Sequence, residues 1–318
     1  MIAQAQVQPV NKDTYKITKP IVKWVGGKTQ IIDTIIGLFP TKIHNYRELF
    51  VGGGSVLLAL LMYVKKGIIT ITGSAYAYDV NDQLISLYKN IQTNHIELYD
   101  KVQEFIKEYT SANGLDVNRD PSTLVEATMS KENYYYWMRK QYNGLSVAGK
   151  NSVTGSAMFV FLNKTCFRGV YREGPRGFNV PYGHYKNPEI INKDHLIEIH
   201  DLIKDVIFAS SDFDASSKEI VHDDFVYLDP PYAPETINSF VSYTKHGFDE
   251  GQHAKLFQLC DNLTDAHIKL LMNNSNVQLI KNHFLNVKYN IHTLTCKRAI
   301  NSKNPNAKTS EVIITNYS

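Results

Sequence analysis

The segment Val226 to Ala233 ends an apolar run in a carboxylate, two prolines and an aromatic side chain. Asp229 can accept a hydrogen bond from an exocyclic amine, and the prolines hold a turn in which the carbonyl of Pro230 can point at the same nitrogen. Tyr232 can stack on the base that carries this amine. Such an amine is a poor nucleophile because its lone pair is delocalised, so two acceptors would activate it by positioning. The segment is therefore typical of an enzyme that transfers methyl to an amine. The alternative is that it is only a strand followed by a proline turn, with no catalytic role.

A glycine-rich turn further upstream could let a ligand approach the backbone closely. A short buried strand, Tyr46 to Val51, is predicted before it, and a helix-length apolar stretch, Val56 to Val64, after it. Gly52 and Gly54 fit the first part of a dinucleotide-binding pattern, but Leu57 occupies the position of its third glycine. Taken alone, this motif is a weak indication of a cofactor site.

An acidic residue follows at a suitable distance. Asp79 ends the strand-like run from Ile68 to Tyr78 and lies 25 residues after Gly54. This is near the spacing at which an acid meets the ribose hydroxyls of an adenosine cofactor. An exposed aspartate at a strand end is the equally good alternative for this residue alone.

The segment Lys23 to Thr29 suggests a phosphate-binding loop, but its spacing fails. The P-loop pattern needs a glycine five residues before Gly27, and Val22 stands there. We therefore expect a loop that presents Trp24 and Lys28 to a ligand.

Together these motifs resemble those of a known enzyme family. In chain order they are Lys23-Trp24-Val25-Gly26-Gly27-Lys28, Phe50-Val51-Gly52-Gly53-Gly54-Ser55, Asp79, Ser211-Asp212-Phe213 and Asp229-Pro230-Pro231-Tyr232. The series is similar to that of Dam-type DNA adenine N6-methyltransferases, the alpha-class enzymes related to the methyltransferases of GATC-type restriction systems. The resemblance runs from about Pro20 to the C-terminus.

The resemblance implies S-adenosylmethionine as the cofactor, with S-adenosylhomocysteine as its product. The positions that match cofactor contacts are Trp24, Lys28, Phe50, Gly52, Gly54, Asp79, Asp212, Phe213 and Asp229. Among these, Asp79 matches the acid on the ribose, and the pair Asp212 and Phe213 matches the residues that hold the cofactor's adenine ring. Asp229 and Tyr232 match the residues that bond the target N6 amine and stack on the flipped adenine. The cofactor's sulfonium makes methyl a good electrophile, so neither a metal nor a covalent intermediate is expected.

Residues 97–194 differ in composition from the flanking sequence, being rich in Tyr, Asn, Lys and Gly, with helices predicted near Leu98 to Tyr109 and Lys131 to Asn143. A loop within them mixes bases, aromatics and glycines, a composition that suits phosphate and base contacts. The resemblance implies a target-recognition role for it. The candidate DNA-contacting residues are Lys23, Arg139, Phe167, Arg168, Val170, Arg172 and Pro181. Tyr134 to Lys140 also suggests a nucleic-acid surface, but aromatics at helical spacing are more often core.

The resemblance leaves the target sequence open. Phe167 matches the aromatic inserted beside the target adenine, and Lys23 matches a lysine that recognises the first base pair. Arg168 stands where GATC enzymes often have asparagine, and His184 where an arginine can occur. We expect a four-base palindrome centred on AT, with GATC as the reference and CATG as the alternative.

The fold class expected is α/β, with a Rossmann-like doubly wound sheet, a reversed C-terminal hairpin strand and an inserted, mainly helical recognition domain. Residues 1–96 and 195–318 would form the methyltransferase core and residues 97–194 the insert. Strands are predicted near Tyr46 to Val51, Ile68 to Asp79, Val206 to Ser210, Phe225 to Asp229, Ile268 to Met272, Val287 to Leu294 and Glu311 to Asn316.

Composition fits but does not identify this function. The chain has 318 residues, 43% of them hydrophobic, and a formal charge of +3, which permits a polyanionic partner without requiring one. Its three cysteines, Cys166, Cys260 and Cys296, have neither disulfide nor zinc-site spacing. No signal sequence or membrane-length apolar run occurs, so a soluble intracellular protein is expected. Duplex DNA is the expected partner; a monomer suffices for sequential methylation of both strands, with a dimer as the alternative.

Three other functions remain open. Cytosine N4-methyltransferases use related chemistry, but serine more commonly replaces the aspartate, so Asp229 favours adenine. A non-catalytic DNA-binding relative is expected to have lost acidic or aromatic site residues, whereas Asp79, Asp229 and Tyr232 are present. An RNA adenine substrate is not excluded by any residue.

Overall fold

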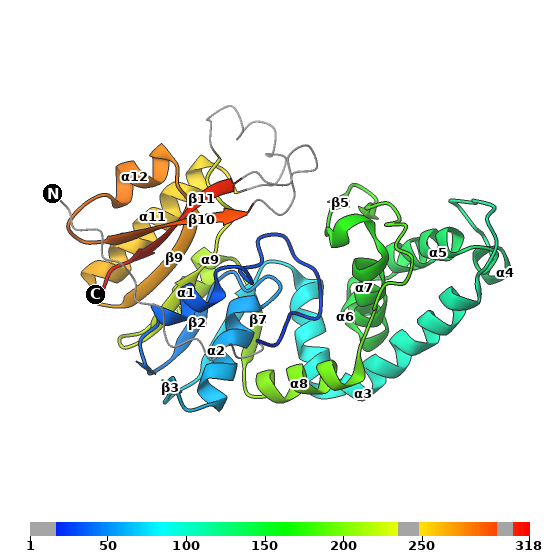
Figure 1. The fold of residues 1–318 in the computed structure, drawn as a ribbon, viewed down its shortest axis with the longest axis horizontal. Helices are drawn as coiled ribbons and strands as arrows, with labels where there is room; N and C mark the ends of the chain where they lie inside the picture. Colours follow the sequence, from blue (N-terminus) through cyan, green and yellow to red (C-terminus); the bar gives the residue numbers. More distant parts are fainter. Residues whose placement is uncertain (1–16, 235–247, 298–307) are drawn as a thin grey trace.

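The central element of the fold is a seven-stranded sheet, shown in Figure 1 in a computed structural model that describes residues 17–234, 248–297 and 308–318. In spatial order its strands are β10 (Asn290–Lys297), β11 (Lys308–Thr315), β9 (Lys269–Ser275), β8 (Phe225–Leu228), β2 (Tyr46–Glu48), β4 (Ala75–Asp79) and β7 (Ile207–Ser210). The neighbours from β9 to β7 pair in parallel, while β11 is antiparallel to both β9 and β10. The expected α/β class with a mostly parallel sheet is confirmed.

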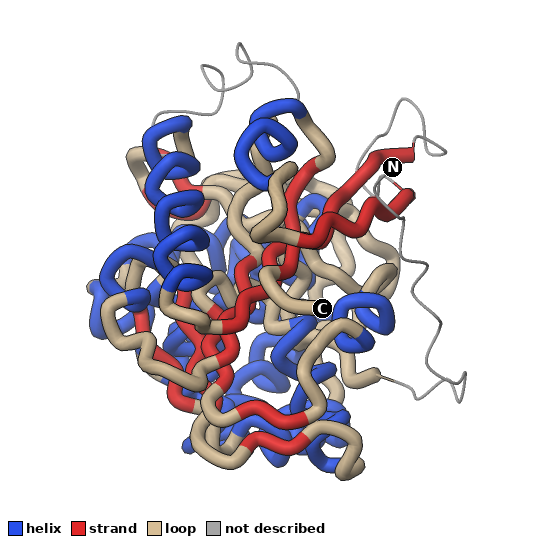
Figure 2. Tube along the Cα trace, turned by 90° about the vertical axis from the view of Figure 1, so that its left-hand side faces the viewer, coloured by secondary structure: helices blue, strands red, loops and turns tan. Residues whose placement is uncertain are grey.

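Helices cover both faces of this sheet, which Figure 2 shows as a twisted layer. They are α1 (Ile32–Gly37), α2 (Ser55–Lys65), α3 (Asp82–Ser111) and α8 (Lys193–Ile203) on one face, and α9 (Phe213–Ser217), α11 (Glu250–Asp265) and α12 (Gln278–Phe284) on the other. Tyr227 and Leu271 pack in the first apolar layer, and Val226 and Leu228 in the second. All four residues of β8 are buried, which explains why this strand is an apolar run without alternation.

The predicted strand Ile68 to Asp79 is two strands in the structure, so that prediction was wrong in part. The short strand β3 (Thr70–Ile71) pairs with β1 (Lys42–Ile43) in a separate sheet, and only β4 joins the central sheet. The chain turns between them at Gly73, where a Cβ would lie 2.2 Å from Asn45 Oδ1. A residue with a side chain does not fit there, so the apolar run is interrupted at this glycine.

Residues between α3 and α8 form a mainly helical region beside the sheet (Figure 1). It comprises α4 (Leu124–Ala127), α5 (Lys131–Gly144), α6 (Val147–Asn151), α7 (Val153–Thr165), the 3₁₀ turn η1 (Phe167–Gly169), β5 (Glu173–Gly174) and β6 (Gly177–Phe178). Helix α3 leads into it and bends at Asn94, whose φ of −139° is not helical. Tyr134 and Tyr135 on α5 are completely buried, so this aromatic cluster belongs to the core rather than to a surface.

Candidate active site

The candidate site lies at the carboxyl edge of the parallel strands. After β2 the chain moves to β4 on one side, and it later returns to place β8 on the other side of β2. Ligands of open α/β sheets bind where the strand order reverses in this way. Phe50 to Gly54 follow β2 here, Asp79 ends β4, and Asp229 to Tyr232 follow β8. The sheet thus brings three of the predicted motifs to one of its edges.

Asp229 occupies a largely buried position with one engaged and one unengaged oxygen. Its Oδ2 lies 2.7 Å from Lys28 Nζ, and the Lys28 side chain is only 5% exposed. Its Oδ1 is buried and has no hydrogen-bond partner among the described residues. Burial raises the pKa of Asp229, and the neighbouring Lys28 ammonium lowers it in part. A buried acceptor without a donor is costly, so Oδ1 is suited to receive a donor from a ligand.

Residues from β9 and β11 hold the loop after Asp229. The hydroxyl of Tyr232 donates a hydrogen bond to Glu311 Oε2 at 2.9 Å, and the ring centroid of Tyr232 lies 4.8 Å from Lys28 Nζ. The N–H of Ala233 donates to Asn274 Oδ1 at 2.9 Å. Neither Glu311 nor Asn274 was predicted from the sequence. The polar run that begins at Asn273, directly after the apolar residues of β9, is the signal that could have indicated Asn274.

The glycine turn is held by Asp79. Its Oδ2 accepts the N–H of Gly52 at 3.0 Å and its Oδ1 that of Asn81 at 2.9 Å, while burial raises its pKa. Gly54 has a φ of 74°, and a Cβ there would lie 2.8 Å from the hydroxyl of Tyr88, which donates to Gly52 O. Glycine is required at position 54 because both the backbone angle and the space exclude a side chain.

An aromatic cluster adjoins this turn. The ring of Phe50 lies 5.5 Å from that of Phe213 and 5.9 Å from that of Phe248, centroid to centroid. Asp212 accepts the N–H of Ala215 at 2.7 Å and so caps α9. Phe248 was not predicted, since nothing in its local sequence marks it. Asp79 and this group of aromatic rings together fit an adenosine, because its ribose needs a hydrogen-bond acceptor and its base needs a stacking surface.

Trp24 links the glycine turn to the helical region. Its ring stacks on Tyr171 with 5.5 Å between centroids and 23° between planes, and it also contacts Phe159. A Cβ at Gly52 would lie 2.9 Å from Trp24 Cδ1, so the indole packs directly on the turn. The Trp24 ring therefore contacts both the glycine turn and the helical region.

Most of the predicted DNA-contacting residues gather around η1. The ring of Phe167 is 48% exposed, and its N–H donates to Pro181 O at 2.8 Å. Arg168 has a φ of 59°, with its guanidinium 5.1 Å from the Phe167 ring centroid. Val170 follows the turn, and Lys23 Nζ lies 4.4 Å from the Tyr185 ring centroid. The turn thus presents an exposed aromatic beside a cation.

Arg172 and Arg139 have partners within the protein. Arg172 donates to Asn179 Oδ1 at 2.7 Å, across the two strands β5 and β6. Arg139 donates to Val180 O at 3.1 Å and lies 4.6 Å from the Tyr136 ring centroid. These contacts orient both guanidinium groups.

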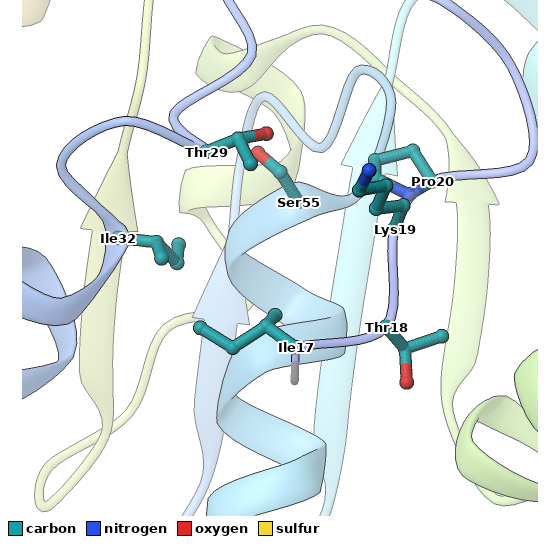
Figure 3. A pocket seen from close by; sticks show the side chains of 7 residues that line it. All are labelled: Ile17, Thr18, Lys19, Pro20, Thr29, Ile32 and Ser55. Carbon is teal, nitrogen blue, oxygen red and sulfur yellow. The ribbon is translucent and has the colours of Figure 1, made fainter. Parts of the chain in front are cut away.

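A small hollow near the start of α2 adjoins Lys28, whose N–H donates to Ser55 Oγ at 3.2 Å (Figure 3). It is lined by Ile17 to Pro20, Thr29, Ile32 and Ser55, and its volume is about 10 Å³. That volume holds one water molecule at most, so the hollow is not a substrate site. Among the described residues, no cluster of His, Cys, Asp and Glu could hold a metal, and no helix is long and apolar enough to cross a membrane.

Comparisons with known proteins agree on one family. Residues 24–300 match the model of the D12 class N6 adenine-specific DNA methyltransferases. The chain is 36% identical to the Type II methyltransferase M.MjaIII of Methanocaldococcus jannaschii, covering 94% of this chain and 99% of the relative. It is 29% identical to the Type II methyltransferase M1.LlaDCHI of Lactococcus lactis subsp. cremoris (94% and 95% covered) and 26% identical to the DNA adenine methylase of Escherichia coli K12 (95% and 96% covered).

The geometry and these matches lead to the same conclusion. Members of this family use S-adenosylmethionine as the methyl donor, and the acid and aromatic cluster at the strand ends fit its adenosine half. The chain therefore belongs to the D12 class N6 adenine-specific DNA methyltransferases and is an adenine-specific DNA methyltransferase.

Proposed function

We propose that the enzyme methylates N6 of an adenine flipped out of duplex DNA, within a four-base palindrome centred on AT: GATC, or CATG as the alternative. The observation that supports this most directly is the buried Asp229 Oδ1, which has no hydrogen-bond partner among the described residues. Lys28, which pairs with the other oxygen of Asp229, also lies 4.8 Å from the Tyr232 ring centroid. An exocyclic amine supplies the donor that Asp229 Oδ1 needs.

In the mechanism proposed, the loop after β8 positions the amine. Asp229 Oδ1 and the carbonyl of Pro230 each accept a hydrogen bond from the N6 amine, and the Tyr232 ring stacks on the base. Withdrawal of the lone pair from the ring makes the nitrogen nucleophilic. When bound, S-adenosylmethionine supplies a sulfonium-activated methyl group. The hydrogen bond from Tyr232 to Glu311 fixes the ring before the base arrives.

The cofactor site proposed consists of the predicted residues and one addition. Asp79 would accept the ribose hydroxyls, while Gly52 and Gly54 allow close approach of the backbone. The other predicted contacts are Trp24, Lys28, Phe50, Asp212, Phe213 and Asp229. We add Phe248, because its ring completes the aromatic cluster with Phe50 and Phe213.

We assign target recognition to residues 97–194 and catalysis to residues 1–96 and 195–318. Lys23, from the catalytic part, would join Phe167, Arg168, Val170, Arg172 and Pro181 in contacting bases, and Arg139 would contact phosphate. The antiparallel pair β10 and β11 would be the reversed C-terminal hairpin of the sheet; residues 298–307, between the two strands in the sequence, lie outside the described residues. A monomer would methylate the two strands in sequence.

The test is incubation with methyl-labelled S-adenosylmethionine and unmethylated plasmid, followed by nucleoside analysis and single-molecule sequencing. Label in N6-methyldeoxyadenosine at a shared four-base palindrome supports the proposal. Modified adenines without a shared context would overturn the palindrome. Label in N4-methyldeoxycytidine, or transfer to RNA alone, would overturn the substrate, and no label with retained cofactor binding would indicate a binding-only role.

A further inference from the structure

Asn163, at the end of α7, is bonded to both backbone polar groups of Lys23. Its Oδ1 accepts the Lys23 N–H at 2.8 Å, and its Nδ2 donates to Lys23 O at 2.8 Å. The same Nδ2 donates to Gly169 O at 3.1 Å. The carboxamide is buried, so these bonds are shielded from water. One side chain therefore joins the Lys23 loop of the catalytic part to the η1 turn.

Two further contacts hold the rest of Lys23. Gly169 has a φ of 64°, and a Cβ there would lie 2.5 Å from Lys23 Cβ and 2.4 Å from its Cδ. The lysine stem therefore lies directly against the backbone of the turn. Its ammonium stands over the ring of Tyr185. Lys23 is thus fixed at its backbone, its stem and its charged end.

These bonds are not needed to end α7. The Cys166 N–H donates to Leu162 O at 2.8 Å and closes the last turn of the helix. A phosphate contact does not require them either, because a flexible lysine neutralises a phosphate wherever its ammonium can reach. Recognition of a base edge does require a fixed direction of approach, and a lysine loses much rotamer freedom to achieve it.

We infer that Asn163 is a positioning residue that aims Lys23 at the outer base pair of the target and thereby sets discrimination at that pair. The inference rests on the proposed role of Lys23 as the residue that recognises this base pair. Asn163 itself touches no base. Without the Asn163 carboxamide, Lys23 keeps its charge, but its side chain is no longer held in one direction.

The experiment compares kcat/KM on duplexes that carry the target found by sequencing, the target changed at its outer base pair, and the target changed at its inner base pair. The variants are Asn163→Leu, Lys23→Ala and a matched control, Asn133→Leu. Asn133 is an equally buried asparagine in the same helical region, bonded to Asn118 N–H and Glu126 O instead. A second pair of variants consists of Gly169→Ala, which displaces the Lys23 stem, and its control Gly67→Ala. Gly67 also has a positive φ, 70°, but an added Cβ there would meet open space.

We expect Asn163→Leu and Gly169→Ala to lower outer-pair discrimination by roughly tenfold, with inner-pair discrimination and cofactor affinity unchanged. Asn133→Leu and Gly67→Ala should leave both ratios as in the wild type. If Lys23→Ala leaves the outer-pair ratio unchanged, the proposed role of Lys23 is wrong. If Lys23→Ala lowers that ratio but Asn163→Leu and Gly169→Ala do not, the inference alone is overturned. Should Asn163→Leu not fold, Gly169→Ala against Gly67→Ala decides between the same two outcomes.

Discussion

Lys28 Nζ lies 2.7 Å from Asp229 Oδ2, with most of both side chains shielded from water. The Lys28 ammonium therefore favours the charged form of the carboxylate at the centre of the proposed site, whereas burial disfavours it. Burial and Lys28 act on the pKa of Asp229 in opposite directions, and burial is the larger effect. This opposition makes the charge of Asp229 sensitive to pH and to substitution of Lys28.

Lys28→Met should move the acidic limb of the kcat profile to higher pH. The pKa of Asp229 is already raised, so the wild type loses activity as pH falls through that pKa and the carboxylate becomes protonated. Without the ammonium the pKa rises further, and activity is lost at a higher pH. The measurement is kcat against pH at saturating cofactor, with the exposed Lys65→Met as control. Coincident limbs in both variants and the wild type would contradict this account.

Asp229→Asn should lower kcat by about 10²–10³-fold, the usual cost of removing one preorganised polar group from a reacting centre. An amide in place of the carboxylate presents one acceptor and two donors, and it carries no charge to attract the amine. Cofactor binding should persist, because Asp79 and the aromatic cluster remain. Single-turnover kinetics and equilibrium dialysis separate the two effects. Turnover at the wild-type rate would refute the role of Asp229; the exposed Asp214→Asn is the control.

Asp79→Ala should weaken cofactor binding by at least about tenfold, since hydrogen bonds to a charged group contribute on the order of 1.5–3 kcal/mol each. The loss also frees the Gly52 and Asn81 N–H groups that the carboxylate now holds. Asp79→Asn retains one acceptor oxygen and should weaken binding less. Calorimetric titration with S-adenosylhomocysteine measures both. Equal affinity of Asp79→Ala and the wild type would remove Asp79 from the cofactor site.

Glu48→Gln should stabilise the protein increasingly as pH rises above the ordinary glutamate pKa. Glu48 is buried, accepts the Tyr46 hydroxyl at 2.8 Å, and has a pKa raised well above its usual value, chiefly by burial. Between the unfolded and folded pKa values the native state binds one more proton, so each pH unit lowers the wild-type unfolding free energy by about 1.4 kcal/mol. Glutamine lacks this dependence. The difference in Tm between variant and wild type, measured from pH 5 to pH 8, should therefore grow with pH; a constant difference would show that Glu48 ionises normally.

Arg47→Met should cost about 3–5 kcal/mol of stability, because it leaves Asp224 as a buried charge without its cation. Arg47 pairs with Asp224 through Nε and donates to the Tyr78 hydroxyl at 3.0 Å, with both charged residues buried. The double variant Arg47→Met/Asp224→Leu should regain much of the loss. Urea unfolding followed by circular dichroism provides the comparison, and a single variant as stable as the wild type would contradict it.

The candidate site residues that could be predicted from the sequence are those whose neighbours along the chain form a recognisable pattern. Asp229 follows an apolar strand and precedes two prolines, and Gly52 and Gly54 precede a helix, so the local pattern located the motifs that the sheet brings together. Phe248 and Glu311 carry no such pattern, because the fold alone brings them to the proposed site from other parts of the chain. Asn274 is marked only by the polar run that begins at Asn273.

Predictions that depended on packing had mixed outcomes. The run Ile68 to Asp79 has the composition of one strand, but its two halves pair with different strands, and the chain turns between them at Gly73. For Tyr134 and Tyr135 the composition suits a nucleic-acid surface, but their helical spacing favoured the core, and both side chains are indeed completely buried.

Helix α3 begins at Asp82, three residues after the acid that holds the glycine turn, and continues for 30 residues into the helical region. A straight helix of 30 residues would span about 45 Å; α3 is bent at Asn94, but each residue added within either half still rotates the downstream chain by about 100°. The number of residues in α3 therefore sets both the distance and the rotation of the helical region relative to the sheet. A single-residue insertion within α3 would therefore rotate the helical region relative to the sheet, whereas exposed side chains around η1 can change without such a rotation. A length change at the exposed residues 115–117, beyond the end of this helix, leaves the length of α3 unchanged.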